Sequence, residues 1–437
     1  MIKRDKSREI FNSAKSFITG GVHSGFRYRT PHPIYFSRGK GSKVWDIDGN
    51  EYIDCLLNMG ACILGHNFEK VNEAVKKQLN RGLTVGLETD LSIEVAKRLS
   101  KMIPSAEIVK ISNTGTEAVM HAIQIARGYT KRNKIIKLEG GYNGWYDYVL
   151  VSSHPRLEDA GPKESPNTVP DSGGLAREVV KNTLVIPFND IDAAERIISK
   201  NSDEVAALVM EPIMFNVGCV CPKQGYLKAI RDLTEDHEIV LVFDEVISGF
   251  RMAPGGAQQY YNVTPDITTL GKAIANGFPL SAVVGREEFM DVTDPESGSV
   301  AFAGTYNANQ ISMAASKATL EELSDGRVQR RLHQLSERLK QEFEAEAEAL
   351  GLQARLQGTA GKFQVYFTNQ DVIDYRSAVA CDKKKYLTFQ GKVFESGVLM
   401  WPSYMLHHGL SAAHTDQDMN FILYNLVAGL KEVKKNN

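Results

Sequence analysis

Short apolar runs alternate with helical patterns through the middle of this 437-residue chain, and this alternation limits the possible folds more than any other feature. The runs are almost continuously hydrophobic, as expected for strands covered on both faces. Between them, residues 116–126 carry apolar side chains at three- and four-residue spacing, and 225–233 begin a second helix. The pattern is typical of βαβ units and predicts a mostly parallel sheet flanked by helices. The predicted strands are residues 108–112, 134–138, 206–210, 239–243, 267–270 and 282–285.

The two ends of the chain have a different pattern. Residues 34–54 predict short antiparallel strands, and 327–350 predict a long charged helix. We therefore expect an α/β protein with two domains. The large domain covers residues 60–320, and a smaller α+β domain is built from residues 1–59 and 321–437.

Composition excludes several classes of function. Lys and Arg number 51 against 53 Asp and Glu, so the chain has no net basic field with which to attract nucleic acid. No run reaches the roughly 18 apolar residues of a membrane span. The charged amino terminus is not a secretory leader, and five cysteines without a Cys-x-x-Cys pair indicate reduced thiols, so we expect a cytoplasmic protein. The histidines lack metal-ligand spacing, and we predict no metal site.

The segment 242–246 (VFDEV) is an apolar strand that ends in acidic residues. One interpretation is a strand that holds Mg²⁺ in a nucleotide site, which requires a Gly-x-x-x-x-Gly-Lys-Ser/Thr loop for the phosphates. The nearby Gly271-Lys272 is followed by Ala273, and Asp266 stands where the first glycine should be. The nucleotide interpretation therefore fails.

The other interpretation pairs Asp244 with Lys272, which ends the next predicted strand. An aspartate that faces a pyridine nitrogen keeps that ring protonated, and a lysine amine forms a Schiff base with an aldehyde cofactor. Together the two residues indicate pyridoxal phosphate. Val246 lies on the same strand face as Asp244 and would support the ring. Taken singly, Asp244 is equally explained by a helix cap or an ion pair, and Lys272 by a solvated strand end.

Two glycine-containing turns favour the cofactor interpretation. Residues 112–118 (SNTGTEA) join a strand to a helix, where free backbone N–H groups at the positive end of the helix dipole suit a phosphate. Threonines in this turn are also ordinary helix caps. Residues 140–144 (GGYNG) follow another strand, and Tyr142 there has the freedom to lie flat against a ring or simply to pack within its loop.

At this point the chain resembles a known family over nearly its whole length. It is similar to the class III, fold-type I pyridoxal-phosphate aminotransferases, and within them to the glutamate-1-semialdehyde 2,1-aminomutases. Eight stretches in the same order carry the resemblance: residues 20–27 (GGVHSGFR), 46–54 (DIDGNEYID), 63–66 (ILGH), 112–118 (SNTGTEA), 210–216 (MEPIMFN), 243–251 (FDEVISGFR), 268–280 (TTLGKAIANGFPL) and 303–315 (AGTYNANQISMAA).

The resemblance implies a role for individual residues. Lys272 would be the catalytic Schiff-base lysine, and Ser24 and Arg27 would hold a substrate carboxylate. Thr305 matches a threonine that reaches the cofactor of the neighbouring subunit, which implies a homodimer with shared sites. The full set of implied cofactor-binding residues is Gly115, Thr116, Tyr142, Glu211, Asn216, Asp244, Val246, Lys272 and Thr305.

Three positions depart from the aminomutases. Met59 replaces a pocket tryptophan, Asn143 replaces the histidine after the stacking tyrosine, and Leu406 replaces a gating glutamate. We place all three in the substrate pocket. The sequence predicts an aminotransferase that moves an amino group from a small-molecule donor to a carbonyl acceptor. The alternatives are an aminomutase and a non-catalytic homologue, and the joint presence of Lys272 and Asp244 argues against the latter.

Overall fold

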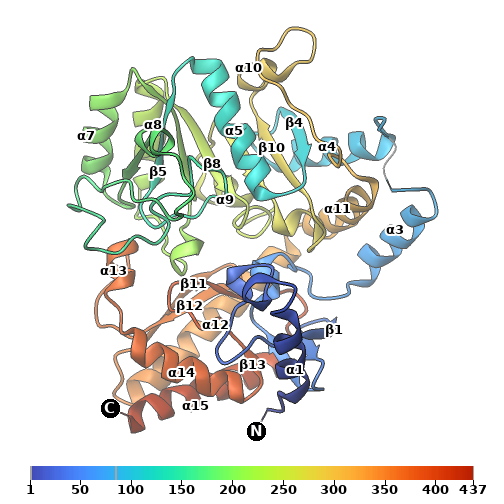
Figure 1. Ribbon diagram of the computed structural model, residues 1–437, viewed down its shortest axis with the longest axis vertical. Helices are drawn as coiled ribbons and strands as arrows, with labels where there is room; N and C mark the ends of the chain where they lie inside the picture. The colour runs from blue at the N-terminus through green and yellow to red at the C-terminus, as the bar shows by residue number, and fades with distance from the viewer. Residues whose placement is uncertain (1, 84–85, 437) are drawn as a thin grey trace.

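A seven-stranded sheet forms the centre of the larger part of the molecule (Figure 1). The computed structural model describes residues 2–83 and 86–436. β10 runs antiparallel to both of its neighbours and the remaining pairs are parallel, so the predicted α/β fold with a mostly parallel sheet is confirmed. In spatial order the strands are β4 (Ile108–Ser112), β10 (Ser281–Gly285), β9 (Ile267–Leu270), β8 (Val240–Glu245), β7 (Val205–Met210), β5 (Lys134–Leu138) and β6 (Thr183–Ile186).

Helices cover both faces of this sheet, because its central strands are apolar on both sides. α5 (Gly115–Thr130) packs on the face that presents Val209 and Val242. α7 (Ile191–Asn201) and α8 (Tyr226–Asp236) pack on the opposite face. The edge strand β6 has no counterpart among the predicted strands. Three further helices lie beyond the β4 edge of the sheet. They are α3 (Glu69–Leu79), α4 (Asp90–Met102) and α11 (Gln310–Leu323).

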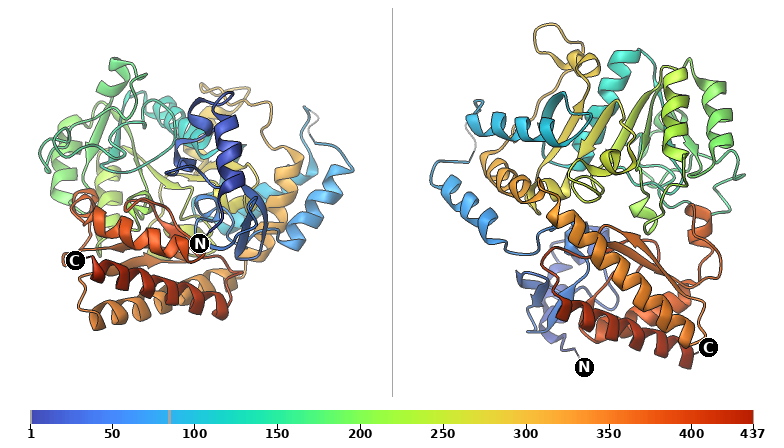
Figure 2. Two further views of the ribbon diagram at one scale, coloured as in Figure 1. Left: turned by 60° about the horizontal axis from the view of Figure 1, so that its bottom comes forward. Right: turned by 180° about the vertical axis from the view of Figure 1, so that it is seen from behind.

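The smaller part of the molecule combines both ends of the chain (Figure 2). Ile53 and Cys55 share a hydrophobic cluster with the last three long helices and the strands between them, which supports our proposal that residues 1–59 and 321–437 form one domain. One sheet contains β1 (Phe36–Lys40), β2 (Lys43–Asp46), β3 (Glu51–Asp54) and β13 (Val398–Leu399), and a second contains β11 (Arg355–Thr359), β12 (Lys362–Tyr366) and β14 (His408–Gly409). The helices are α12 (Arg327–Ala349), α14 (Lys383–Glu395) and α15 (Asp416–Lys435).

The chemistry-bearing segments follow the carboxyl ends of parallel strands. Asp244 lies at the end of β8, Lys272 follows β9, and Glu211 follows β7. The loop with Tyr142 follows β5, and α5 begins just after β4. Ligands of open α/β sheets bind at this edge, so the fold brings residues from distant parts of the sequence to one place.

Candidate active site

A cavity of about 500 Å³ lies at this edge of the sheet. Of the residues predicted for the site, Ser24, Thr305 and Leu406 do not line it. The structure brings the other eleven together around the cavity: Arg27, Met59, Gly115, Thr116, Tyr142, Asn143, Glu211, Asn216, Asp244, Val246 and Lys272.

The Asp244 carboxylate is buried and held on both oxygens. Its Oδ2 accepts a hydrogen bond from Asn143 Nδ2 at 2.7 Å, and its Oδ1 accepts from Thr269 Oγ1 at 3.1 Å and from the Val246 N–H at 3.2 Å. Burial raises the pKa of Asp244, while these donors stabilise the ionised form and oppose the rise. The sequence places Asn143 with the substrate, whereas its side chain contacts this acid.

Lys272 opens the short 3₁₀ helix Lys272–Ala275 with a φ of 46°. A positive φ is uncommon for a residue with a side chain and is typical of functional sites. Burial lowers the pKa of the Lys272 amine, and the negative charges of Asp244 and Glu211 oppose this shift. A lowered pKa increases the fraction of free amine near neutral pH, and the free amine is the nucleophilic form.

Glu211 provides a test of whether the cavity suits a cofactor. Its Oε2 accepts from the N–H groups of Phe215 and Asn216 at 3.1 and 3.3 Å, but its buried Oε1 has no partner in the described part of the chain. Burial raises the pKa of Glu211 to about 8. An unpaired buried oxygen costs free energy, so a donor group on a bound molecule fits this position.

The beginning of α5 offers a second feature that fits a cofactor, in this case its phosphate. Thr114 and Glu117 form a capping box that uses the N–H groups of Asn113, Thr114 and Glu117. Within the described residues, the N–H groups of Gly115 and Thr116 have no protein acceptor, and both residues line the cavity. Free N–H groups at a helix N-terminus bind phosphate. A Cβ at Gly115 would lie 3.0 Å from the Val246 side chain, so glycine keeps this approach open.

The Tyr142 loop is held by a buried lysine that the sequence analysis did not single out. Lys137 in β5 is fully buried, and its Nζ donates to the Gly141 carbonyl at 2.6 Å and to the Val151 carbonyl. Asn216 Nδ2 donates to the Tyr142 carbonyl at 3.2 Å and holds the loop from the other side. A lysine inside the apolar run KIIKL is the sequence signal that could have indicated this contact.

We expect Lys137→Met to destabilise the protein by about 1–3 kcal/mol, because two buried carbonyls lose their donor. Burial lowers the pKa of Lys137 to about 8 from its usual 10.5, so the unfolded chain holds more protons between these values. Stability contributed by this group therefore rises with pH between about 8 and 10.5, and the variant should lose that slope. Denaturant unfolding across this pH range measures both effects.

Lys134→Met is the matched control, because Lys134 begins the same strand and forms an ion pair with Glu204 at 2.8 Å near the surface. Such pairs contribute about 0–1 kcal/mol. Equal losses in the two variants would contradict a stabilising role for the hydrogen bonds of Lys137 to the Gly141 and Val151 carbonyls.

Met59 reaches the cavity from an unusual turn. Leu57, Asn58, Met59 and Gly60 have φ values of 50°, 51°, 58° and 86°, which describe one left-handed turn. This conformation costs about 1–2 kcal/mol for each residue with a side chain. Asp54 Oδ1 accepts from the Leu56 N–H at 2.7 Å before the turn, and Arg251 donates to the Gly60 carbonyl at 2.8 Å after it.

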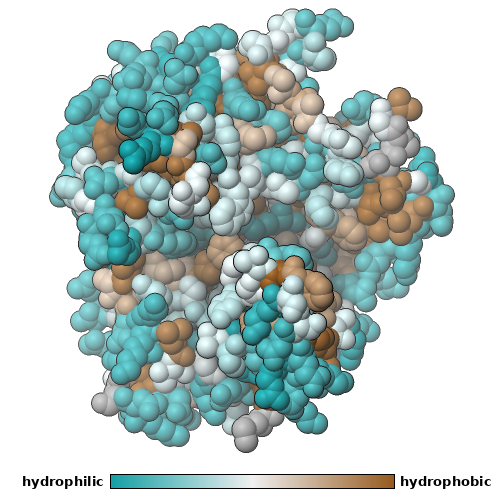
Figure 3. Space-filling view, viewed as in Figure 1, coloured by the Kyte–Doolittle hydropathy of each residue, from teal (hydrophilic) through white to brown (hydrophobic). Residues whose placement is uncertain are grey.

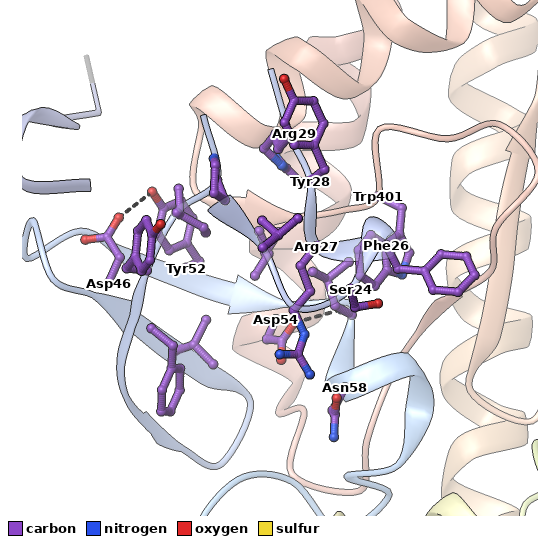
Figure 4. A pocket seen from close by; sticks show the side chains of 18 of the residues that line it. Ser24, Phe26, Arg27, Tyr28, Arg29, Asp46, Tyr52, Asp54, Asn58 and Trp401 are labelled. Atoms are coloured by element: carbon purple, nitrogen blue, oxygen red, sulfur yellow. Dashed lines mark hydrogen bonds between the residues drawn. The ribbon is translucent and has the colours of Figure 1, made fainter. Parts of the chain in front are cut away.

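Three predicted residues lie outside this cavity. Ser24 lines a second, adjoining cavity that is drawn in Figure 4. Leu406 lines a groove with His154 and Tyr404, and Thr305 is exposed. Thr305 has no contact with the cavity of its own chain, so its role toward a neighbouring subunit stays a prediction.

Comparisons with known proteins agree with this geometry. Residues 26–402 match the family model for aminotransferase class-III. A glutamate-1-semialdehyde 2,1-aminomutase from Methanocaldococcus jannaschii is 43% identical over 416 residues, which cover 95% of this chain and 96% of that protein. The crystal structure of an omega-transaminase from Sphaerobacter thermophilus superposes with a TM-score of 0.93 and 33% identity, covering 98% of this chain and 97% of that one.

The chain therefore belongs to the class III aminotransferases. It is an enzyme that depends on pyridoxal phosphate and acts on small molecules. A glutamate-1-semialdehyde aminomutase from Pseudomonas aeruginosa shares the fold with a TM-score of 0.87 at 24% identity over 98% of this chain and 94% of its own. No helix among residues 2–83 and 86–436 is long and apolar enough to cross a membrane.

Proposed function

We propose that this enzyme is an intermolecular aminotransferase, which takes an amino group from one molecule and gives it to a second carbonyl compound. The observation that carries the proposal is that a second cavity lies next to the cofactor cavity. Arg27, Asn58 and Met59 line both of them, so a larger space adjoins the site. An aminotransferase must release one product and admit a second substrate, whereas an aminomutase must retain its intermediate.

We propose a role for each part of the site. Pyridoxal phosphate supplies the electron-withdrawing ring that stabilises negative charge on the substrate carbon. Lys272 carries the proton between the substrate carbon and the cofactor, and Asp244 keeps the ring nitrogen protonated. Asn143 and Thr269 hold that carboxylate in place. The N–H groups of Gly115 and Thr116 bind the phosphate, and Tyr142 and Val246 enclose the ring.

The remaining groups bind the substrate and complete the cofactor site. Glu211 and Asn216 lie beside the position proposed for the ring's hydroxyl, and the unpaired Oε1 of Glu211 supports this assignment. Arg27 pairs with a substrate carboxylate, and Ser24 assists it from the adjoining cavity. Leu406 lines an outer groove. Because this residue is a leucine, no carboxylate stands where the aminomutases have their gating glutamate.

The second candidate function is the intramolecular aminomutase reaction. Its support is the curated relatives, since the Methanosphaera stadtmanae protein with that name is 39% identical over 434 residues that cover 99% of this chain and all of its own length. The retained Ser24 and Arg27 are compatible with either reaction.

One assay separates the two candidates. The holoenzyme is incubated with glutamate-1-semialdehyde alone and, separately, with a panel of amino donors and a keto acid acceptor. We expect transamination in the second mixture and little 5-aminolevulinate in the first. Efficient conversion of the semialdehyde without a donor, together with no transamination, would establish the aminomutase instead.

We propose a homodimer with shared sites, since Thr305 matches a residue that acts on the neighbouring subunit. Exposed apolar side chains support an interface along α3, α4 and their connection: Leu79, Leu83, Leu87 and Ile93. Figure 3 shows a hydrophobic patch on the side of the molecule where α3 lies. We expect light scattering at assay concentration to give the mass of a dimer, and a fully active monomer would contradict the shared site.

We propose a cytoplasmic location on the basis of the thiols. Cys55, Cys62, Cys219, Cys221 and Cys381 are all unpaired. Free thiols are typical of reducing compartments, which supports the proposal of a cytoplasmic enzyme.

A further inference from the structure

The cavity that adjoins the active site has a volume of about 830 Å³ (Figure 4). It lies between the irregular segment that contains Arg27 and the sheet of β1, β2 and β3. Its size is that of a small-molecule site. It shares the lining residues Arg27, Asn58 and Met59 with the cofactor cavity, so the two spaces adjoin at these three residues.

The walls of this second cavity are largely apolar. Ile34, Val44, Leu56 and Leu399 line it and belong to one hydrophobic cluster with Tyr52 and Phe394. Trp401 lines it as well. Removing an apolar group from water into such a space is favourable in proportion to the area buried, so the cavity suits a hydrophobic ligand.

Most of the charged groups around the cavity are already paired. Asp46 accepts hydrogen bonds from Tyr52 at 2.9 Å and from Asn50 at 2.7 Å, and Asp54 is 2.7 Å from His66. Arg29 donates to the Met400 carbonyl at 2.6 Å and stacks on Phe394 at 4.2 Å.

Arg27 differs from these groups, because it forms no ion pair or hydrogen bond through its side chain with any described residue. It therefore stands at the junction of the two cavities as a free cation. A planar guanidinium in this position matches the geometry of a carboxylate.

We propose that the second cavity receives the side chain of an amino donor that is an amino acid with a bulky apolar group. Its carboxylate pairs with Arg27, its amine faces Lys272, and its aryl or branched alkyl group fills the space bounded by Ile34, Leu56 and Leu399. The inference rests on the proposed aminotransferase function and adds the class of donor.

The test begins with binding, which is independent of turnover. Calorimetry compares 3-phenylpropionate with propionate, two unreactive carboxylates, on the holoenzyme. We expect 3-phenylpropionate to bind about 10- to 100-fold more tightly, the ratio given by burying an aromatic side chain. Ile34→Trp places an indole in the cavity and should reduce this ratio to below about threefold, whereas the matched control Ile34→Leu should keep it. Arg27→Gln should weaken both carboxylates alike.

Single-turnover reactions then separate this inference from the proposed function. Phenylalanine and alanine are mixed in turn with the holoenzyme, and the loss of its visible absorbance is followed. Faster conversion by phenylalanine supports the inference. Conversion by alanine with no advantage for phenylalanine, or equal binding of the two carboxylates, overturns the donor class while the aminotransferase stands. If no donor reacts although 3-phenylpropionate binds selectively, the proposed function fails. The cavity then remains a binding site for carboxylates that carry an apolar group.

Discussion

Lys272→Ala is expected to abolish turnover and to remove the covalent link to the cofactor. In the wild-type protein we expect a visible absorbance that borohydride bleaches, because the free amine of Lys272 is favoured by its buried position. Without this amine the enzyme loses both its attachment point and its proton carrier. The loss of a general base alone typically lowers the rate by about 10²–10⁴-fold, so activity should fall by at least about 10²-fold.

Two other buried lysines make this experiment decisive. Lys137 is fully buried beside the Tyr142 loop, and Lys362 is fully buried with its Nζ 3.3 Å from His407 Nδ1. Burial lowers the pKa of both amines, as it does for Lys272. Borohydride reduction followed by peptide mapping identifies the modified residue. A reduced adduct on Lys137 or Lys362 in the Lys272→Ala protein would move the attachment site, whereas Lys362→Met should keep the adduct on Lys272.

The central part of the site could be predicted from the sequence, because strand topology determines where strand ends lie. Asp244 and Lys272 end neighbouring parallel strands, and the register pairs Asp244 with Thr269. Since both strands run in the same direction, their carboxyl ends had to meet at one edge. The turn that we propose for the phosphate was predictable for a similar reason, since a strand, a glycine turn and a helix are contiguous in the chain.

The rest depends on contacts that sequence spacing does not encode. The left-handed turn at Met59 is held by Arg251, which is far away in the sequence. The second cavity forms where the segment of Arg27 packs over β2 and β3 and meets Trp401 near the other end of the chain. The position of Asn143 after Tyr142 predicts a contact with the substrate, but the loop conformation directs its amide to Asp244.

Asp244→Asn is expected to keep the covalent link to Lys272 but to lower turnover by about 10²–10³-fold, the typical cost of removing one preorganised electrostatic contact. A carboxylate beside the ring nitrogen holds a proton there, whereas an amide has no charge with which to do so. Spectra before and after borohydride, together with single-turnover rates, measure the two effects separately. This pattern differs from that of Lys272→Ala, in which linkage and rate are lost together.

The groups around Asp244 provide graded controls for this prediction. Asn143→Ala removes the 2.7 Å hydrogen bond to Oδ2, and Thr269→Val removes the 3.1 Å bond to Oδ1, while both leave the charge in place. A hydrogen bond to a charged group contributes about 1.5–3 kcal/mol, so each variant should lose roughly 10- to 100-fold if the contact acts fully on the rate. The expected order of activity is wild type, then Thr269→Val and Asn143→Ala, then Asp244→Asn. An Asp244→Asn protein that is as active as Thr269→Val would show that the charge of Asp244 does not act on the ring, and the buried acid would then be a structural partner of Asn143.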